Sequence, residues 1–314
     1  MSSTACIPDV VITTEHRRFA EFCDACRRAR YIGLCYGPPG VGKTFSARHY
    51  ARWDTVTAAP LATQVSDATL AELVTRTTVV YTPPVVTSPG RLEREIQQWR
   101  WTLRAFHWEA LHREEAVRLA EARQHEAARW RQGLRGRRVL GVPIATPVRA
   151  AMPLGQIATA YAHQRQATPD PTRLIILDEA DRLKTAGLEQ VRDIFDRGEL
   201  GVILIGMPGL EKRLSRYPQL YSRVGFVHAF RPLSTPEVRQ LLQDRWLPAG
   251  VTLPAHGVTD AAALAAIIRI TGGNFRLLHR LLTQIARLME INALPQVTQQ
   301  VVEAARESLV IGAV

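Results

Sequence analysis

A glycine-rich segment between two structured flanks constrains this chain more than any other feature. Residues 37–44 match the pattern G-x-x-x-x-G-K-T. Residues 31–36 before it are apolar and β-prone, and a helix is expected from about Lys43 to Trp53. A strand, a glycine-rich turn and a helix in this order surround a phosphate with backbone N–H groups at a helix N-terminus. The segment therefore predicts a nucleotide-binding α/β fold.

The glycine-rich segment supplies most of the candidate binding residues. Lys43 is expected to reach the β- and γ-phosphates of ATP, and the Thr44 hydroxyl is expected to ligate Mg²⁺. The complete set of cofactor-binding candidates in this segment is Gly37, Pro38, Pro39, Gly40, Val41, Gly42, Lys43, Thr44 and Phe45.

An acidic pair after a second apolar run completes the predicted site. Residues 174–177 are four apolar residues, as in a strand buried on both faces of a parallel sheet. Asp178 then lies at the carboxyl end of the strand, where it can hold Mg²⁺ through a water. Glu179 can orient and deprotonate the attacking water. The alternative is that both acids only begin the next helix as favourable N-terminal charges.

These two motifs together resemble the AAA+ ATPase superfamily. Residues 201–206 resemble the strand that carries sensor 1, residues 221–224 the segment with an arginine finger, and residues 272–276 the lid motif with sensor 2. The resemblance implies an α/β fold: a P-loop AAA+ core with a parallel sheet, a long helical insertion and a C-terminal all-α lid. It also implies ATP hydrolysis with Mg²⁺.

The resemblance gives two arginines separate catalytic roles. Arg223 would neutralise γ-phosphate charge in the neighbouring subunit, which implies an oligomer, and Arg276 would contact the nucleotide of its own chain. Arg213 and Arg216 are rivals for the finger role, and Arg223 as an ordinary surface arginine is the alternative. The strand that resembles sensor 1 ends Gly206-Met207-Pro208 without a polar side chain, which leaves open both efficient hydrolysis and a role of ATP mainly as a conformational clamp with slow turnover.

The predicted domains are an AAA+ core over residues 1–230, with the insertion at about 88–140, and a lid over 231–314. Thr14 is expected to cap a first helix that ends near Arg28, and Val11 or Ile12 is expected to touch the adenine. Further helices are expected over 68–75, 153–165, 187–197, 235–246, 260–271, 275–292 and 297–309, and a further strand over 77–82.

The insertion is the least explained part of the sequence. Residues 91–132 contain no proline or glycine, and apolar residues recur at three- and four-residue steps, which predicts one long helix or a helical pair. Residues 88–138 hold 12 arginines and 7 glutamates. A DNA clamp, a docking surface for a protein and an amphipathic helix packed on its own core all remain open. The tryptophans favour packing over base stacking, and Arg135, Arg137 and Arg138 are candidates for phosphate contact.

Composition indicates a cytoplasmic protein with anionic partners. The formal net charge is +11, and a basic balance favours phosphate backbones through counterion release. An acidic protein partner and a compositional bias towards arginine are the alternatives. No apolar run is long enough to cross a membrane. Cys23 and Cys26 form one C-x-x-C pair, which is typical of two thiols on a packed helix face, with a zinc site as the alternative.

Two segments narrow the resemblance further. Residues 205–224 and the lid sequence G-G-N-F-R-L-L are similar to those of the TniB/TnsC/MuB-type transposition ATPases. This resemblance implies ATP-dependent rings or helical filaments on non-specific duplex DNA. It also implies recruitment or activation of a transposase, with a target-selector protein as a further partner. A clamp-loader-like, initiator-like or defence ATPase, whose insertion docks a protein, is the alternative.

Overall fold

The computed structural model describes residues 11–59, 66–114, 128, 167–243, 247, 251, 253, 258 and 260–309. Its centre is a five-stranded parallel sheet in the order β2-β3-β4-β1-β5. The strands are β1 (Ile32–Tyr36), β2 (Thr78–Tyr81), β3 (Leu174–Leu177), β4 (Gly201–Gly206) and β5 (Val224–Ala229). Strands β1 to β4 are almost entirely buried, whereas β5 is a largely exposed edge. The predicted α/β fold with a parallel sheet is therefore confirmed.

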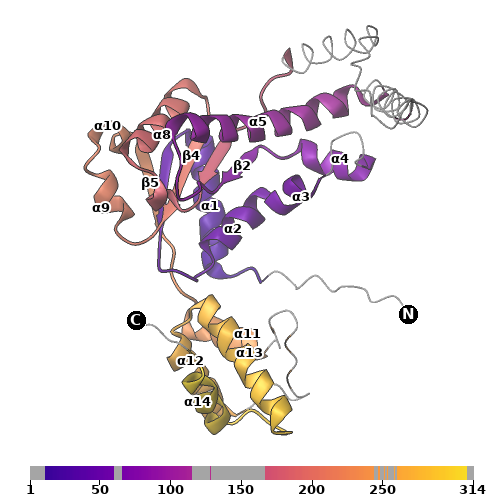
Figure 1. Ribbon diagram of the computed structural model, residues 1–314, viewed down its shortest axis with the longest axis vertical. Helices are drawn as coiled ribbons and strands as arrows, with labels where there is room; N and C mark the ends of the chain where they lie inside the picture. Colours follow the sequence, from indigo (N-terminus) through magenta and orange to yellow (C-terminus); the bar gives the residue numbers. More distant parts are fainter. Residues whose placement is uncertain are drawn as a thin grey trace, which may run out of the picture.

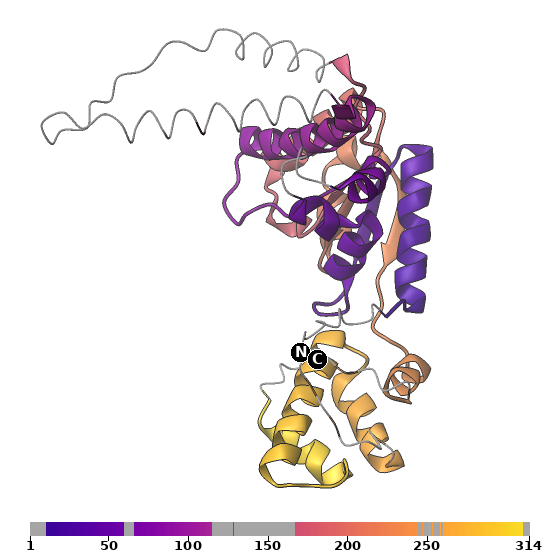
Figure 2. The ribbon, with the colours of Figure 1, turned by 90° about the vertical axis from the view of Figure 1, so that its right-hand side faces the viewer.

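Helices cover both faces of the sheet (Figures 1 and 2). Helix α1 packs against β1, β4 and β5, whereas α5 contacts β2 and α8. The helices in the described residues of this half are α1 (Thr14–Ala29), α2 (Lys43–Ala51), α3 (Trp53–Ala58), α4 (Asp67–Val74), α5 (Pro89–Leu111), α8 (Thr185–Arg197), α9 (Leu210–Leu214) and α10 (Pro218–Tyr221). One cluster of buried apolar side chains, from Phe19 to Phe230, unites them. Central β1 thereby presents the glycine-rich segment at the carboxyl edge of the sheet.

Helix α1 lies unusually close to the sheet. A Cβ on Gly33 would lie 2.5 Å from Cys26 Sγ and 2.6 Å from Phe22 Cζ. The helix begins at Thr14, as expected, but its cap is not Thr14: the Thr13 hydroxyl accepts the cap hydrogen bond from His16 N–H.

Four further helices gather beyond the C-terminal end of β5 (Figure 1). They are α11 (Thr235–Gln243), α12 (Ala261–Thr271), α13 (Phe275–Ile291) and α14 (Gln299–Glu307), close to the expected lid helices. Their apolar side chains form a second buried cluster that runs from Leu233 to Ala305. Asn274 caps α13 by accepting N–H bonds from Arg276 and Leu277, and this places Arg276 in the first turn.

The described part of the insertion belongs to the main core. Helix α5 buries Leu92, Ile96, Leu103 and Phe106 in the same cluster as the sheet. Trp99 packs edge-on against Trp53, with ring centroids 4.9 Å apart. The expectation of packing over base stacking therefore suits these side chains. The basic cluster at residues 135–138 and the helix expected over 153–165 lie outside the described residues.

Candidate nucleotide site

The glycine-rich segment forms a tight turn between β1 and α2. Gly40 and Gly42 have φ angles of 80° and 108°, a region that L-residues with side chains rarely adopt. A Cβ on Gly42 would find no atom within 4 Å, so this part of the turn faces open space. The turn is thus held open at the N-terminus of α2, the arrangement that binds phosphate groups elsewhere.

Lys43 lies across this turn. Its ammonium donates to Gly37 O at 2.6 Å and to Pro38 O at 2.7 Å. Burial lowers the pKa of Lys43 from its ordinary value, and nearby Cys35, Asp178 and Asp181 oppose that shift. The cation is therefore held at the turn by carbonyl groups that an anionic ligand can replace.

A cavity of about 500 Å³ opens between the turn, the acidic pair and the lid. Nine predicted residues line it: Pro39, Gly40, Gly42, Lys43, Thr44, Phe45, Asp178, Glu179 and Arg276. Of the other predicted residues in the turn, Val41 is buried in the core. The hydroxyl of Thr44 and the carboxylate of Asp178 are oxygen ligands of the kind that Mg²⁺ prefers. Together with the Lys43 cation and the helix N-terminus, they fit a magnesium–nucleotide complex.

The two acids after β3 differ in their surroundings. Asp178 is 3% exposed and accepts a hydrogen bond from Glu179 N–H at 2.9 Å. Glu179 has a left-handed backbone, with φ 51°, and its carboxylate forms an ion pair with Arg182. A non-glycine residue in this conformation is typical of a strained functional position. The ion pair holds one of the two Glu179 carboxylate oxygens, Oε2, against the Arg182 guanidinium.

Asp181 also lines the cavity, although it was not among the predicted site residues. Its Oδ2 accepts a hydrogen bond from Met207 N–H at 2.8 Å, at the end of β4. A Cβ on Gly206 would lie 2.6 and 2.8 Å from its two carboxylate oxygens. A polar group thus stands at the end of the sensor 1 strand, but it comes from the turn after β3. In the sequence, a third acid three residues after Asp178 was the feature that could have indicated this residue.

The lid touches the glycine-rich turn directly. Asn274 Nδ2 donates to Pro39 O at 2.8 Å, and Arg276 N–H donates to Gly40 O at 3.1 Å. A Cβ on Gly40 would lie 2.6 Å from Asn274 Oδ1. Asn274 was not among the predicted site residues, because its role depends on where the lid sits.

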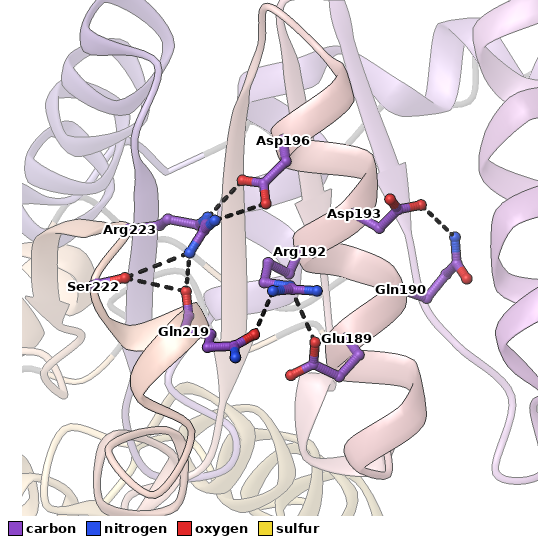
Figure 3. A network of polar contacts seen from close by, with 8 residues as sticks. All are labelled: Glu189, Gln190, Arg192, Asp193, Asp196, Gln219, Ser222 and Arg223. Atoms are coloured by element: carbon purple, nitrogen blue, oxygen red, sulfur yellow. Dashed lines mark hydrogen bonds and ion pairs between the residues drawn. The ribbon is translucent and has the colours of Figure 1, made fainter.

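Arg223 lies apart from this cavity. It follows α10 and forms a two-pronged ion pair with Asp196 of α8, with Nε to Oδ1 at 2.5 Å and Nη2 to Oδ2 at 2.8 Å (Figure 3). Its rival Arg213 donates to Asp181 O and Leu183 O and so braces the turn after β3. Arg216 is exposed. Of the three candidates for the arginine finger, Arg213 is the one whose hydrogen bonds lie beside the cavity of its own chain.

A histidine pair joins α1 to α2, the helix that follows the glycine-rich turn. His16 Nδ1 is 3.0 Å from Ser46 Oγ, and His16 Nε2 is 3.1 Å from His49 Nδ1. Burial lowers the pKa of both histidines. His49 further lowers the pKa of His16, and the cation of Arg52 further lowers that of His49. The exposed ring of Phe45 stacks on His49, with ring centroids 6.0 Å apart.

Ile12 is 40% exposed, and its expected contact with adenine stays a prediction.

The three cysteines of the described part are buried and free. Burial raises the pKa of Cys23 and Cys35, and it raises that of Cys26 to about 12. Metal ligation needs the thiolate, which these surroundings disfavour. Within the described ranges, no group of three or more His, Cys, Asp or Glu side chains is placed to hold a metal ion. The searched helices of these same ranges include none that is both long and apolar enough to cross a membrane.

The fold and the cavity together define a P-loop nucleotide-binding protein of the AAA class. The chain belongs to the AAA domain family, whose model matches residues 26–214. A potential ATP-binding protein of Staphylococcus aureus is 39% identical over 315 residues, which covers 96% of both chains. Nucleotide binding is therefore a property of the family and of the fold around this cavity.

Solved structures of origin-recognition proteins share the fold. Drosophila ORC bound to DNA matches with a TM-score of 0.52 and 14% identity, over 99% of this chain and 64% of that chain. The ORC2 protein of Aeropyrum pernix, in ADPNP–ADP complexes, matches with a TM-score of 0.51 and 16% identity, over 99% and 72% of the two chains. At these identities the likeness concerns the fold alone.

Proposed function

We propose that this protein is an ATPase whose nucleotide state controls its assembly on non-specific duplex DNA. In this proposal it recruits or activates a transposase, as the TniB/TnsC/MuB-type proteins that it resembles do, and a target-selector protein is a further partner. The core over 1–230 and the lid over 231–314 act as two units, with the nucleotide between them. The observation that carries the proposal is the contact of Asn274 and Arg276 with the glycine-rich turn, because it joins the lid to the phosphate site.

Each site residue has a defined task in this proposal. Bound ATP with Mg²⁺ supplies a phosphoryl group whose charge the metal neutralises. Lys43 would exchange its carbonyl partners for phosphate oxygens, and Thr44 and Asp178 would hold the metal. Glu179 turns away from Arg182 and accepts the proton of the attacking water. Arg276 contacts the nucleotide of its own chain, and Arg223 contacts that of a neighbouring protomer.

The first test of this function is binding to a long non-specific duplex with ATP, with ADP and without nucleotide, while particle size is followed. Binding and growth with ATP alone are expected, with affinity that falls steeply as salt rises. Lys43→Ala should abolish assembly, whereas Lys212→Ala, which removes an exposed lysine from α9, should assemble as the parent does. Assembly of Lys43→Ala at the parent level would contradict the proposal.

Hydrolysis needs its own test, because assembly can depend on ATP without turnover. Glu179→Gln should reduce turnover by at least about 100-fold while nucleotide binding is kept. Glu199→Gln is the matched control, since Glu199 is an exposed carboxylate that pairs with Arg30 before β4. Equal turnover in parent and Glu179→Gln would mean that Glu179 is not the base.

A second candidate function is favoured by the arginines of α5. Three of them are already paired with acids of the same chain: Arg91 with Glu95, and both Arg100 and Arg104 with Asp170. Arginines that are already paired are less available to phosphate groups, so the described part of the insertion is also suited to docking a protein, as in a clamp-loader-like, initiator-like or defence ATPase.

Replacement of the insertion beyond α5 separates the two candidates. Helix α5 must be kept, because its apolar face is part of the core. Replacement of residues 115–140 by a flexible linker should weaken ATP-dependent DNA assembly if the insertion clamps DNA. Unchanged assembly together with loss of a protein partner would support the second candidate.

A further inference from the structure

The side chain of Arg223 has little freedom in the single protomer. Besides the two hydrogen bonds to Asp196, its Nη1 donates to the carbonyl oxygen of Gln219. The Arg223 side chain is 29% exposed and that of Asp196 is 36% exposed. The guanidinium thus lies folded against α8 and the end of α10 (Figure 3).

Helix α8 holds Asp196 in a defined place. Arg192, on the same helix, pairs with Glu189 at 3.0 Å and donates to the side chain of Gln219 on α10. On another side of α8, Arg197 pairs with Glu93 of α5 at 2.8 Å. The last turns of α8 are therefore tied to both neighbouring helices, and the Asp196 carboxylate is fixed beside Arg223.

We propose that Asp196 is an autoinhibitory partner of Arg223, which masks this arginine in the free protomer and is exchanged for a nucleotide phosphate of the neighbouring protomer on assembly. This inference rests on the proposed function, in which Arg223 acts across a subunit interface. It adds a step that the bare arginine-finger role does not contain, because the guanidinium must first leave a carboxylate of its own chain.

Charge and geometry support the exchange. The Nε–Nη2 edge of a guanidinium binds a carboxylate or a phosphate in the same two-pronged way, so both anions compete for it. An ion pair that is about one-third exposed is weak, so a well-placed phosphate can displace the carboxylate. The pair therefore raises the protein concentration that assembly needs without preventing assembly.

Asp196→Asn tests the restraint, because the amide keeps the shape of the side chain and removes its charge. Light scattering against protein concentration, with ATP and a fixed duplex, should show a threshold roughly two- to five-fold lower than that of the parent, the range expected for releasing an exposed ion pair. Asp193→Asn is the matched control: it removes the same charge one turn earlier, where the carboxylate pairs with Arg197.

Arg223→Ala separates failure of this inference from failure of the proposed function. Arg223→Ala should assemble poorly, and Asp196→Asn with Arg223→Ala should behave as Arg223→Ala alone, because the restraint acts only through Arg223. The inference is overturned if Asp196→Asn leaves the threshold unchanged, raises it, or lowers it no more than Asp193→Asn does. If Arg223→Ala assembles as the parent does, the finger role itself fails, whatever Asp196→Asn shows.

Discussion

At the scale of single residues, Asp181 places a carboxylate at the end of β4. The end of β4 carries glycine and methionine where the resemblance led us to expect a polar side chain, and the Asp181 carboxylate lies beside these two residues. A carboxylate that accepts a backbone N–H bond can both hold the end of β4 and face the cavity that it lines. The turn after β3 therefore supplies the polar side chain that was expected from the end of β4.

Asp181 should therefore matter for turnover. Asp181→Ala is expected to lower ATP hydrolysis by about tenfold or more, because a polar group facing the reacting centre is lost and the end of β4 loses its anchor. Asp181→Asn keeps an acceptor for Met207 N–H and should hydrolyse ATP faster than Asp181→Ala. Turnover measured at saturating ATP checks this, and parent-like rates for Asp181→Ala would remove Asp181 from the site.

A second prediction at this scale concerns His228, on β5, whose ring stacks on Phe22 and lies 3.7 Å from Glu15 Oε2. Burial lowers the pKa of His228, against the opposing effect of Glu15. The unfolded chain then takes up the proton first, so the free energy of unfolding should fall as pH drops below about 6.5, until the folded ring is protonated as well.

The variant His228→Phe tests this sign, since phenylalanine suits the aromatic neighbours and does not titrate. Denaturation midpoints of the parent and the variant should be similar at pH 8. Towards pH 5 the variant should lose less stability than the parent, although His16 and His49, whose pKa values are also lowered, retain their share. Parallel pH curves for the two proteins would refute a contribution from His228.

At the scale of elements, the packing of α1 on β1 depends on one glycine. Gly33→Ala would place a methyl group on Cys26 and Phe22, so it should destabilise the fold by about 1–3 kcal/mol. Gly90→Ala is the matched control, because a Cβ there, in the first turn of α5, meets nothing within 4 Å. That control should be neutral or slightly stabilising. Denaturant unfolding of both variants measures the difference, and equal midpoints would contradict the close approach.

At the scale of the whole molecule, the lid and the core meet at the nucleotide site. Asn274 caps α13 and also donates to Pro39 O, so it serves both halves. Glu237 of α11 accepts a bond from Thr14 N–H at the start of α1, a second link between the halves. Nucleotide binding at this site should therefore change the stability of the contacts between the lid and the core.

The expected result for Asn274→Ala is a smaller thermal stabilisation by ATP and weaker ATP-dependent assembly. Thr298→Ala is the control, because Thr298 caps α14 away from the glycine-rich turn. Both variants lose a helix cap, which costs about 1 kcal/mol, so both should melt slightly earlier without nucleotide. An equal response to ATP in the two variants would mean that the contact with Pro39 carries no signal.

Much of the nucleotide site could be predicted from the sequence, because its determinants are local. The residues of the turn, the Thr44 hydroxyl and the acids after β3 lie within short segments whose conformation follows from glycine, helix and strand preferences. The expected helices and strands in the described ranges are present within a few residues of their expected bounds. The cap of α1 was assigned to the wrong one of two adjacent threonines, because Thr13 and Thr14 carry the same capping hydroxyl.

Local sequence is enough to define the class of site: a strand, a phosphate-binding turn, a helix, and an acidic pair after a second buried strand. The tertiary structure alone decided which distant groups meet there. Asp181 reaches Met207, Asn274 reaches Pro39, and Asp196 reaches Arg223, across separations of 26, 235 and 27 residues. Such pairs depend on strand order and on the placement of the lid, and these follow from the packing of the whole core rather than from any local preference of the chain.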